Sequence, residues 1–169
     1  FLGIILLHYM DDIAIFASTA ELCAQQTAIV LADLEALGFI VNHEKSVTQP
    51  VQRMEFLGYE IDTTGVPVFR VPAHRIARLR DMLLFLESAL GSVPVRTLAS
   101  VTGQILSMSL ALAPARLFTR ALYRIIDAAH RDTLPGGWNA TVSLTKAARE
   151  EIAFWLRGLD RWNGLPVFR

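Results

Sequence analysis

Cysteine, net charge, internal repeats and targeting signals are all scarce or missing in this sequence. Its 169 residues include one cysteine, Cys23, which excludes an internal disulfide bond and fits a reducing compartment. No repeat or low-complexity tract is present, and a hydrophobic content of 53% excludes a disordered tail. The first residues lack the basic region and cleavage site of a signal peptide. They also lack an initiator methionine, so we expect the chain to be a segment of a longer protein.

A convincing membrane span is missing as well. The 19 residues between Arg96 and Arg116 carry no charge and are nearly enough to cross a bilayer. They nevertheless include several hydroxyl and amide side chains, with Pro114 near the end, and these make the stretch much less apolar than a typical span. We expect a buried helix here, in a soluble protein that is intracellular, either cytoplasmic or nuclear, and has no membrane partner.

The net charge is zero, but the charges are distributed unevenly. Residues 1–62 hold two basic and nine acidic side chains, a net charge of −7, whereas residues 63–169 hold fourteen basic and seven acidic ones, a net charge of +7. Two solvated surfaces of opposite sign would explain this asymmetry. An acidic half that collects metal ions, joined to a basic half that grips a polyanion, would explain it too.

Hydrophobic patterning predicts two short strands around a pair of acidic residues. The runs "GIILLHY" and "IAIFAS" are apolar and rich in isoleucine, and they flank Met10-Asp11-Asp12. Aspartate suits tight turns, so the pattern predicts a β-hairpin with carboxylates at its tip. Ser18 lies three residues before Glu21, which is the spacing of a capping box. It predicts the start of a long helix that Gly38 ends.

A second hairpin is predicted further along the chain. Phe39–Asn42 first predicts a short strand, and residues 43–46 predict a loop. The runs "MEFLGYEID" and "VPVFRV" then flank Thr63-Thr64-Gly65 and predict the hairpin itself.

From Pro72 onward the chain is predicted to be helical. Apolar residues at positions 76, 79, 83, 86 and 90 follow helical spacing up to Gly91. Pro94 and Pro114 mark the starts of two further helices, Pro135-Gly136-Gly137 predicts a loop, and Leu144–Leu159 predicts the last helix. The predicted fold is therefore α+β, with two β-hairpins and a helix in residues 1–71 and an all-helical domain in residues 72–169.

The adjacent aspartates of the first hairpin are candidate metal ligands. Carboxylates held close together repel one another, and a hard divalent cation such as Mg²⁺ relieves that repulsion because it prefers oxygen ligands. Such a site suits phosphoryl transfer, in which two metal ions stabilise the attacking and leaving oxygens. An ordinary aspartate-rich turn is the alternative, because a Tyr-x-Asp-Asp tetrapeptide also occurs by chance.

Three motifs in the same order resemble those of reverse transcriptases. Tyr9-Met10-Asp11-Asp12, between two apolar strands, resembles the metal-binding hairpin of that family. "LGFIVNHEKS", residues 37–46, looks like the next palm motif, and "EFLGY", residues 55–59, resembles the primer-grip hairpin. The later runs "LASVTGQILSMSLALAPARLFTRALYR" and "WLRGLDRWNG" look like the thumb and connection of retrotransposon enzymes, most similar to the DIRS-type group.

This resemblance implies a partial polymerase palm over residues 1–71 and a thumb and connection over residues 72–169. It implies RNA-directed DNA synthesis by two-metal-ion nucleotidyl transfer with Mg²⁺ or Mn²⁺. The implied partners are an RNA template, a DNA primer and deoxynucleoside triphosphates. A further metal-binding aspartate and the fingers would lie upstream in the parent chain, so the isolated segment is expected to be inactive; whether an RNase H domain follows is left open. The alternative is a decayed or domesticated relic that binds nucleic acid without catalysis.

The resemblance also implies roles for single residues in the first domain. Asp11 would bind the catalytic metal pair with Asp12 as a weaker ligand, and Lys45 would protonate the pyrophosphate leaving group. Tyr9 and Met10 would lie under the primer terminus. Without the resemblance, plain hairpin packing would explain Tyr9 and Met10, and a solvated surface charge would explain Lys45.

Primer-binding residues are implied in the second hairpin: Phe56, Leu57, Gly58 and Tyr59. A strand whose apolar face points inward is the alternative there, and both readings can hold together. Among the tryptophans, Trp138, Trp155 and Trp162 are predicted to be packing anchors. Gly103, inside a predicted helix, predicts a close helix–helix approach.

Arginines are the candidate phosphate contacts of the second domain. Arg116, Arg120 and Arg124 follow i, i+4, i+8 spacing and predict one stripe, opposite an apolar face formed by Leu117, Ala121, Leu122, Ile125 and Ile126. Such a stripe contacts phosphates without reading base sequence. A solvated face partly paired with Asp127 is the alternative, and the same two interpretations apply to Arg75 and Arg78.

Overall fold

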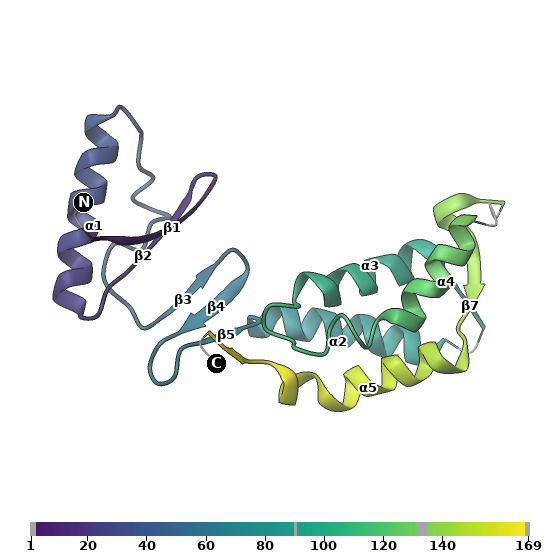
Figure 1. Ribbon diagram of the computed structural model, residues 1–169. Helices are drawn as coiled ribbons and strands as arrows, with labels where there is room; N and C mark the ends of the chain where they lie inside the picture. Colours follow the sequence, from purple (N-terminus) through teal and green to yellow (C-terminus); the bar gives the residue numbers. More distant parts are fainter. Residues whose placement is uncertain (1–2, 90, 132–134, 168–169) are drawn as a thin grey trace. The chain divides into compact units, whose positions relative to one another are not determined.

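The computed structural model describes residues 3–89, 91–131 and 135–167 (Figure 1). The chain divides into two compact units, Phe1–Leu57 and Gly58–Arg169, and each is described by itself. Mixed α and β structure agrees with the predicted fold class. Residues 58–71 belong to the second unit, whereas the division into palm and thumb at residues 71 and 72 stays a prediction.

A tight hairpin opens the first unit. Strands β1 (Ile5–Tyr9) and β2 (Asp12–Phe16) pair antiparallel, and Tyr9 lies opposite Asp12. This register leaves Met10 and Asp11 as a two-residue loop, because strands paired up to the last residue need only two residues to reverse direction. The predicted hairpin and its acidic tip are confirmed.

Helix α1 (Ala20–Ala36) follows the hairpin and is defined at both ends by local hydrogen bonds. The prediction that Ser18 caps it is wrong by one residue, because the Thr19 hydroxyl accepts the backbone N–H of Leu22 at 3.1 Å. At the other end, Gly38 takes a φ of 88° and the N–H of Phe39 bonds the Leu34 carbonyl at 3.0 Å. This is a Schellman motif, which glycine favours, so the predicted helix stop at Gly38 is confirmed.

The segment after α1 contains an element that was predicted wrongly. Phe39–Asn42 is not a strand, since the described residues provide no neighbouring strand for its backbone, and Ile40 is 99% exposed. A strand needs a partner for its N–H and C=O groups, and apolar residues alone do not supply one. The loop predicted at residues 43–46 is present, and β3 (Arg53–Phe56) ends the first unit.

A small antiparallel sheet begins the second unit. Its strands are β4 (Tyr59–Asp62), β5 (Val68–Arg70) and β8 (Leu165–Pro166), in the order β4-β5-β8. The β4–β5 pair is the predicted second hairpin. The run predicted as its first strand is interrupted at Leu57 and Gly58, whose φ values of 51° and 75° belong to a tight turn and not to a strand.

Four helices build most of the second unit: α2 (Ala73–Ser88), α3 (Val95–Ser107), α4 (Arg120–Arg131) and α5 (Lys146–Trp162). Helix α2 lies along α5 and α3, and α4 packs on α3 and α5 (Figure 1). The predicted apolar stripe of α2 is confirmed, because Ile76, Leu79, Leu83 and Leu86 are buried; position 90 lies outside the described residues. Buried residues of all four helices form one core, in which Trp155 is fully enclosed.

The prediction that this region is all-helical is wrong. Strands β6 (Ser92–Pro94) and β7 (Thr141–Ser143) pair antiparallel, and the short helix η1 (Gly137–Asn139) precedes β7. These strands have only three residues each, so they are too short for an alternating pattern to reveal them. The C-terminal strand β8 was missed for the same reason.

The helix start predicted at Pro114 is also wrong. The Pro114 carbonyl accepts the N–H groups of Leu117 and Phe118 in an isolated turn, and α4 begins at Arg120. Glu151, on α5, sets this start because its carboxylate accepts the N–H groups of Ala121 and Leu122 at 2.9 and 3.1 Å. A carboxylate at a helix N-terminus satisfies free donors and favours the helix dipole.

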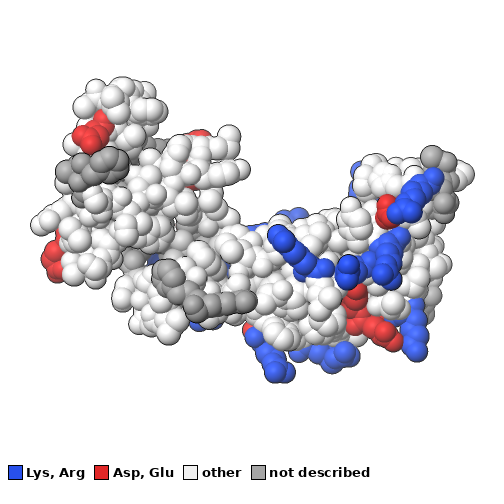
Figure 2. Space-filling view, in the orientation of Figure 1, with Lys and Arg blue, Asp and Glu red and all other residues white. Residues whose placement is uncertain are grey.

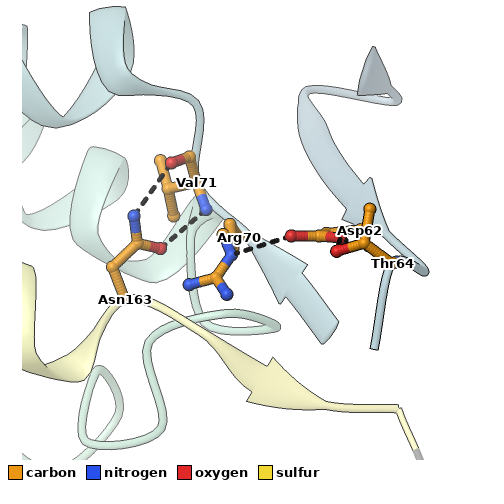
Figure 3. Close-up of polar contacts among 5 residues, drawn as sticks. All are labelled: Asp62, Thr64, Arg70, Val71 and Asn163. Carbon is orange, nitrogen blue, oxygen red and sulfur yellow. Dashed lines mark hydrogen bonds and ion pairs between the residues drawn. The ribbon is translucent and has the colours of Figure 1, made fainter. Parts of the chain in front are cut away.

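A bidentate contact joins the end of α5 to the start of α2 (Figure 3). The Asn163 side chain accepts the Val71 N–H at 2.7 Å and donates to the Val71 carbonyl at 2.9 Å. Close by in the same sheet, Arg70 lies 3.8 Å from the buried carboxylate of Asp62, which also accepts the Thr64 hydroxyl. The Asn163 contact pairs two backbone groups of Val71 that would otherwise be buried without a partner.

Two further findings concern predictions about packing and membranes. Gly103 is exposed and a Cβ added there meets nothing within 4 Å, so the predicted close helix–helix approach is wrong. None of the helices in the described ranges combines the length and apolarity needed to cross a bilayer.

Candidate active site and nucleic-acid surface

The tip of the β1–β2 hairpin is held in a strained conformation. Met10 takes a φ of 53°, which costs a residue with a side chain roughly 1 kcal/mol or more. The ring of His8 stabilises this backbone, because its Nε2 donates to the Met10 carbonyl at 2.5 Å. Positive φ at a non-glycine residue often marks a functional loop. His8 was not singled out from the sequence, where a histidine inside an apolar strand carries no signal of a turn contact.

Asp11 and Asp12 lie at this tip, and both are exposed. Neither carboxylate forms a hydrogen bond or an ion pair with another described residue. Adjacent unpaired carboxylates repel one another and favour a bound cation. Two ligands do not make a complete site, and within the described ranges no group of three or more acidic, histidine or cysteine side chains is close enough to hold a metal ion.

The two residues before the aspartates are also presented to solvent. Tyr9 is 57% and Met10 is 75% exposed. Neither side chain is therefore buried by packing within this chain, although that was the alternative reading of both residues. Large apolar side chains at the surface are available for contact with another molecule.

Lys45 lies in the turn after α1. Its backbone N–H donates to the Asn42 carbonyl and side-chain oxygens, both at 3.2 Å. Its side chain is exposed and forms no hydrogen bond or ion pair with Asp11, Asp12 or any other described residue. The structure thus shows an available cation but no contact with the acidic tip.

The second candidate region centres on Gly58 and Tyr59. Phe56 is half-buried and Leu57 is 43% exposed, at the end of the first unit. In the second unit, the Tyr59 hydroxyl donates to the Ser107 carbonyl at 2.5 Å, at the C-terminal end of α3. Gly58 approaches Arg75 so closely that an added Cβ would lie 2.8 Å from Nη1. Glycine suits this φ of 75°, and a residue with a Cβ would have to displace the Arg75 guanidinium.

Arg75 and Arg78, both predicted to contact nucleic acid, have different surroundings. Arg75 donates to the Gly58 carbonyl at 2.6 Å and to the Ser107 hydroxyl at 3.0 Å. Arg78 is exposed and has no ion pair or hydrogen bond to the rest of the described chain. Arg78 therefore has all its guanidinium donors available to a phosphate, whereas Arg75 uses two of its donors inside the fold.

The arginine stripe is present as exposed charge, but not as one helical stripe. Arg120 and Arg124 lie on α4, whereas Arg116 precedes it, and Leu117 is 59% exposed instead of packed. Lys and Arg side chains gather over α4 in Figure 2. None of the three arginines is paired with another described residue, because Asp127 pairs with Arg131. Phosphates of a nucleic acid can therefore contact each of these guanidinium groups without breaking an ion pair.

The tryptophans are only partly explained as packing anchors. Trp155 is fully buried and its Nε1 donates to the Phe118 carbonyl at 2.7 Å, as predicted for an anchor. Trp138 and Trp162 are 46% and 36% exposed. Trp162 lies near Phe154 and Arg161, and Trp138 makes an edge contact with His130.

Sequence comparison connects the first unit to a known family. Residues 1–61 match the family model described as reverse transcriptase (RNA-dependent DNA polymerase). The Gag-Pol polyproteins of Rous sarcoma virus subgroup C (strain Prague) and avian leukosis virus subgroup A (isolate RSA) are each 35% identical over 96 residues. That alignment covers 53% of this chain and 6% of each polyprotein, so the chain spans a small part of these relatives.

Structural comparison agrees over a longer stretch. The foamy viral protease-reverse transcriptase in complex with double-stranded DNA superposes with a TM-score of 0.67 and 19% identity, over 92% of this chain and 24% of the other. The same viral protein in complex with an RNA/DNA hybrid gives a TM-score of 0.65 and 18% identity, over 92% and 19%. The shared fold extends through both units of this chain.

Proposed function

We propose a polymerase function from one premise: this chain carries reverse transcriptase family sequence over residues 1–61 and has a reverse transcriptase fold. Its parent protein, in this proposal, is an RNA-directed DNA polymerase, and the chain is the part that runs from the palm into the thumb and connection. The DIRS-type assignment stays a prediction, since the similar proteins named above are viral.

The observation that carries the proposal is the hairpin tip. Two adjacent carboxylates stand exposed and unpaired on a turn whose backbone is strained and supported by His8. A two-residue hairpin loop needs a positive φ at its first residue, which glycine or asparagine usually supplies, whereas here Met10 takes that φ at a cost. Strain kept at a loop that presents unpaired charge is typical of a functional site.

The family implies a divalent metal ion as cofactor, and the ligand atoms at the hairpin tip suit such an ion. Asp11 and Asp12 offer only hard oxygen ligands, which suit Mg²⁺ or Mn²⁺. Asp11 would be a ligand of the metal pair and Asp12 a supporting ligand, and the parent chain would supply the others. When bound, the metal ions stabilise negative charge on the phosphates of the nucleotide.

The other residues of the first unit act on the primer and the leaving group in this proposal. Tyr9 and Met10 place their exposed side chains beneath the primer terminus and help to orient its 3′ hydroxyl. The Lys45 ammonium, free of other partners in the described chain, donates a proton to the pyrophosphate leaving group. Phe56 and Leu57 contact the primer strand from the end of β3.

The second unit contributes binding to nucleic acid. Arg78, Arg116, Arg120 and Arg124 are exposed and unpaired within the described residues, so they can contact phosphates by charge. The foamy viral neighbours were solved with double-stranded DNA and with an RNA/DNA hybrid, which supports a duplex as the partner here. The proposed substrates are a primed RNA template and deoxynucleoside triphosphates, in an intracellular setting. Upstream fingers complete the parent enzyme.

The second candidate function is that of a relic that binds nucleic acid without catalysis. In it the second unit still binds nucleic acid, but the β1–β2 hairpin has no catalytic role. The presence of Asp11, Asp12 and Lys45 together disfavours it. One experiment distinguishes the two functions: the protein encoded by the full reading frame that contains this chain is incubated with a primed RNA template, deoxynucleotides and Mg²⁺. Extension of the primer is expected. Binding of the duplex without extension would favour the relic.

A further inference from the structure

We propose that Arg75 is a positioning residue: it fixes the Gly58–Tyr59 segment against the C-terminal end of α3 and does not itself contact phosphate. The inference rests on the proposed function and on the prediction that Gly58 and Tyr59 help to hold the primer strand. All the contacts that carry it lie within the second unit, Gly58–Arg169.

The guanidinium of Arg75 joins three elements of that unit. Nη1 donates to the Gly58 carbonyl at 2.6 Å, and Nη2 donates to the Ser107 hydroxyl at 3.0 Å. Its central carbon lies 6.0 Å from the centre of the Tyr59 ring. The planar fork of arginine suits this bridge, because two of its N–H groups point to different acceptors at fixed angles.

Tyr59 adds a second, independent connection to the same place. Its hydroxyl donates to the Ser107 carbonyl at 2.5 Å, and the Ser107 hydroxyl donates in turn to the Gln104 carbonyl at 2.8 Å. The last carbonyls of a helix have no intrahelical partner and carry partial negative charge. The cation of Arg75 and the hydroxyl of Tyr59 therefore meet an end of α3 that attracts both.

The position of Gly58 shows how closely this segment is held. Gly58 takes a φ of 75°, and an added Cβ would lie 2.8 Å from Nη1 of Arg75. The other arginines predicted to contact nucleic acid differ from Arg75, because Arg78, Arg116, Arg120 and Arg124 are exposed and form no hydrogen bond or ion pair with another described residue. Two of the five N–H donors of Arg75 are used inside the fold, so the fold fixes the orientation of its guanidinium.

The consequence is a mechanical connection between the primer-holding segment and the thumb helices. A shift of the α3 C-terminus moves Ser107, and the hydrogen bonds of Ser107 with Arg75 and Tyr59 move these two side chains as well. The placement of the primer strand thereby depends on the position of α3. Loss of Arg75 should therefore slow the chemical step, which needs accurate placement, more than it weakens binding of the duplex.

The first test uses amide hydrogen exchange on the 169-residue chain, with no need for activity. In Arg75→Ala, exchange in the peptide containing Gly58 and Tyr59 should become about tenfold faster, as expected for loss of a hydrogen bond from a charged donor. Arg75→Lys should restore part of the protection, and Arg78→Ala, which removes the same charge from the same helix, should leave it unchanged. Unchanged exchange in Arg75→Ala, or equal acceleration in Arg78→Ala, would overturn the proposal. If Arg75→Ala does not fold, Ser107→Ala gives the second variant, with a smaller acceleration expected.

The second test measures single-turnover nucleotide incorporation and duplex binding in the full reading frame. The incorporation rate of Arg75→Ala should fall about tenfold or more, while the dissociation constant and its salt dependence stay close to those of the wild type. A weaker duplex affinity with a salt slope reduced by about one would show a direct phosphate contact and refute the positioning role. Failure of the wild-type protein to extend primers would contradict the proposed function instead, and the exchange experiment would still decide whether Arg75 holds Gly58.

Discussion

Replacement of Asn163 by alanine should destabilise the second unit strongly, because the side chain satisfies two buried backbone groups at once. Val71 is 2% exposed, and its N–H and carbonyl both bond the Asn163 amide (Figure 3). In Asn163→Ala both groups lose this partner, because the alanine methyl group forms no hydrogen bond. Leaving one buried polar group unsatisfied costs about 1–3 kcal/mol. The costs of two groups in the same contact do not add fully, so we expect the free energy of unfolding to fall by roughly 2–4 kcal/mol.

This loss is a large part of the total stability of a domain, which is about 5–15 kcal/mol. With about 4 °C per kcal/mol for a domain of this size, the midpoint of thermal unfolding should fall by roughly 8–16 °C. Circular dichroism at 222 nm measures it. Asn139→Ala is the matched control, because Asn139 is exposed and bonds Gly136 through its backbone N–H. A fall of less than about 2 °C in Asn163→Ala would refute the reasoning about buried backbone groups.

Three other predictions concern charge, metal and glycine. Replacing Arg116, Arg120 and Arg124 together by alanine should lower the salt slope of duplex binding by about two to three, and an unchanged slope would leave these residues as a solvated surface. The 169-residue chain should bind Mn²⁺ at roughly millimolar concentration, measured by calorimetry, because two carboxylates are few ligands, and Asp11→Ala should abolish that binding. Gly58→Ala should destabilise the chain by about 1–3 kcal/mol in urea, whereas Gly103→Ala, in open space on α3, should stabilise it by about 0.5–1 kcal/mol.

The elements that were predictable from the sequence are those fixed by local patterns. The first hairpin follows from two apolar runs around acidic turn residues, and the end of α1 follows from Gly38, whose conformation favours glycine. Helix α2 follows from the spacing of Ile76, Leu79, Leu83 and Leu86. In each case the determining residues lie close together along the chain, so a single sequence contains the whole signal.

The elements that were missed depend on partners far away in the sequence. The start of α4 is set by Glu151, about thirty residues later, and no local signal at Arg120 reveals it. The apolar run at Phe39–Asn42 was predicted as a strand from its composition, but pairing decides strands, and the described residues give it no partner. Arg75 looked like a surface cation, because nothing in its local sequence indicates contacts with Gly58 and Ser107.

The candidate site was predictable to a similar degree. Tyr9 to Asp12 are recognisable by type and spacing, and the structure places them on an exposed, strained tip. Their functional roles, and that of Lys45, stay predictions, since the structure shows no contact between Lys45 and the acidic tip. His8 and Ser107 could be found only from geometry, because the bond from His8 to the Met10 carbonyl and the bonds of Ser107 with Arg75 and Tyr59 leave no sign in the local sequence.

Single-nucleotide incorporation by the full reading frame tests the central claim, that Asp11 belongs to a metal-dependent nucleotidyl-transfer site, most directly. The wild type, Asp11→Asn and Asp33→Asn are compared on a primed RNA template with Mg²⁺; Asp33 is an exposed acid on α1 and serves as the matched control. We expect the rate to fall by at least about 10³-fold in Asp11→Asn, because a lost metal ligand removes stabilisation of transition-state charge, and to stay unchanged in Asp33→Asn. Equal rates in the wild type and Asp11→Asn would contradict the account.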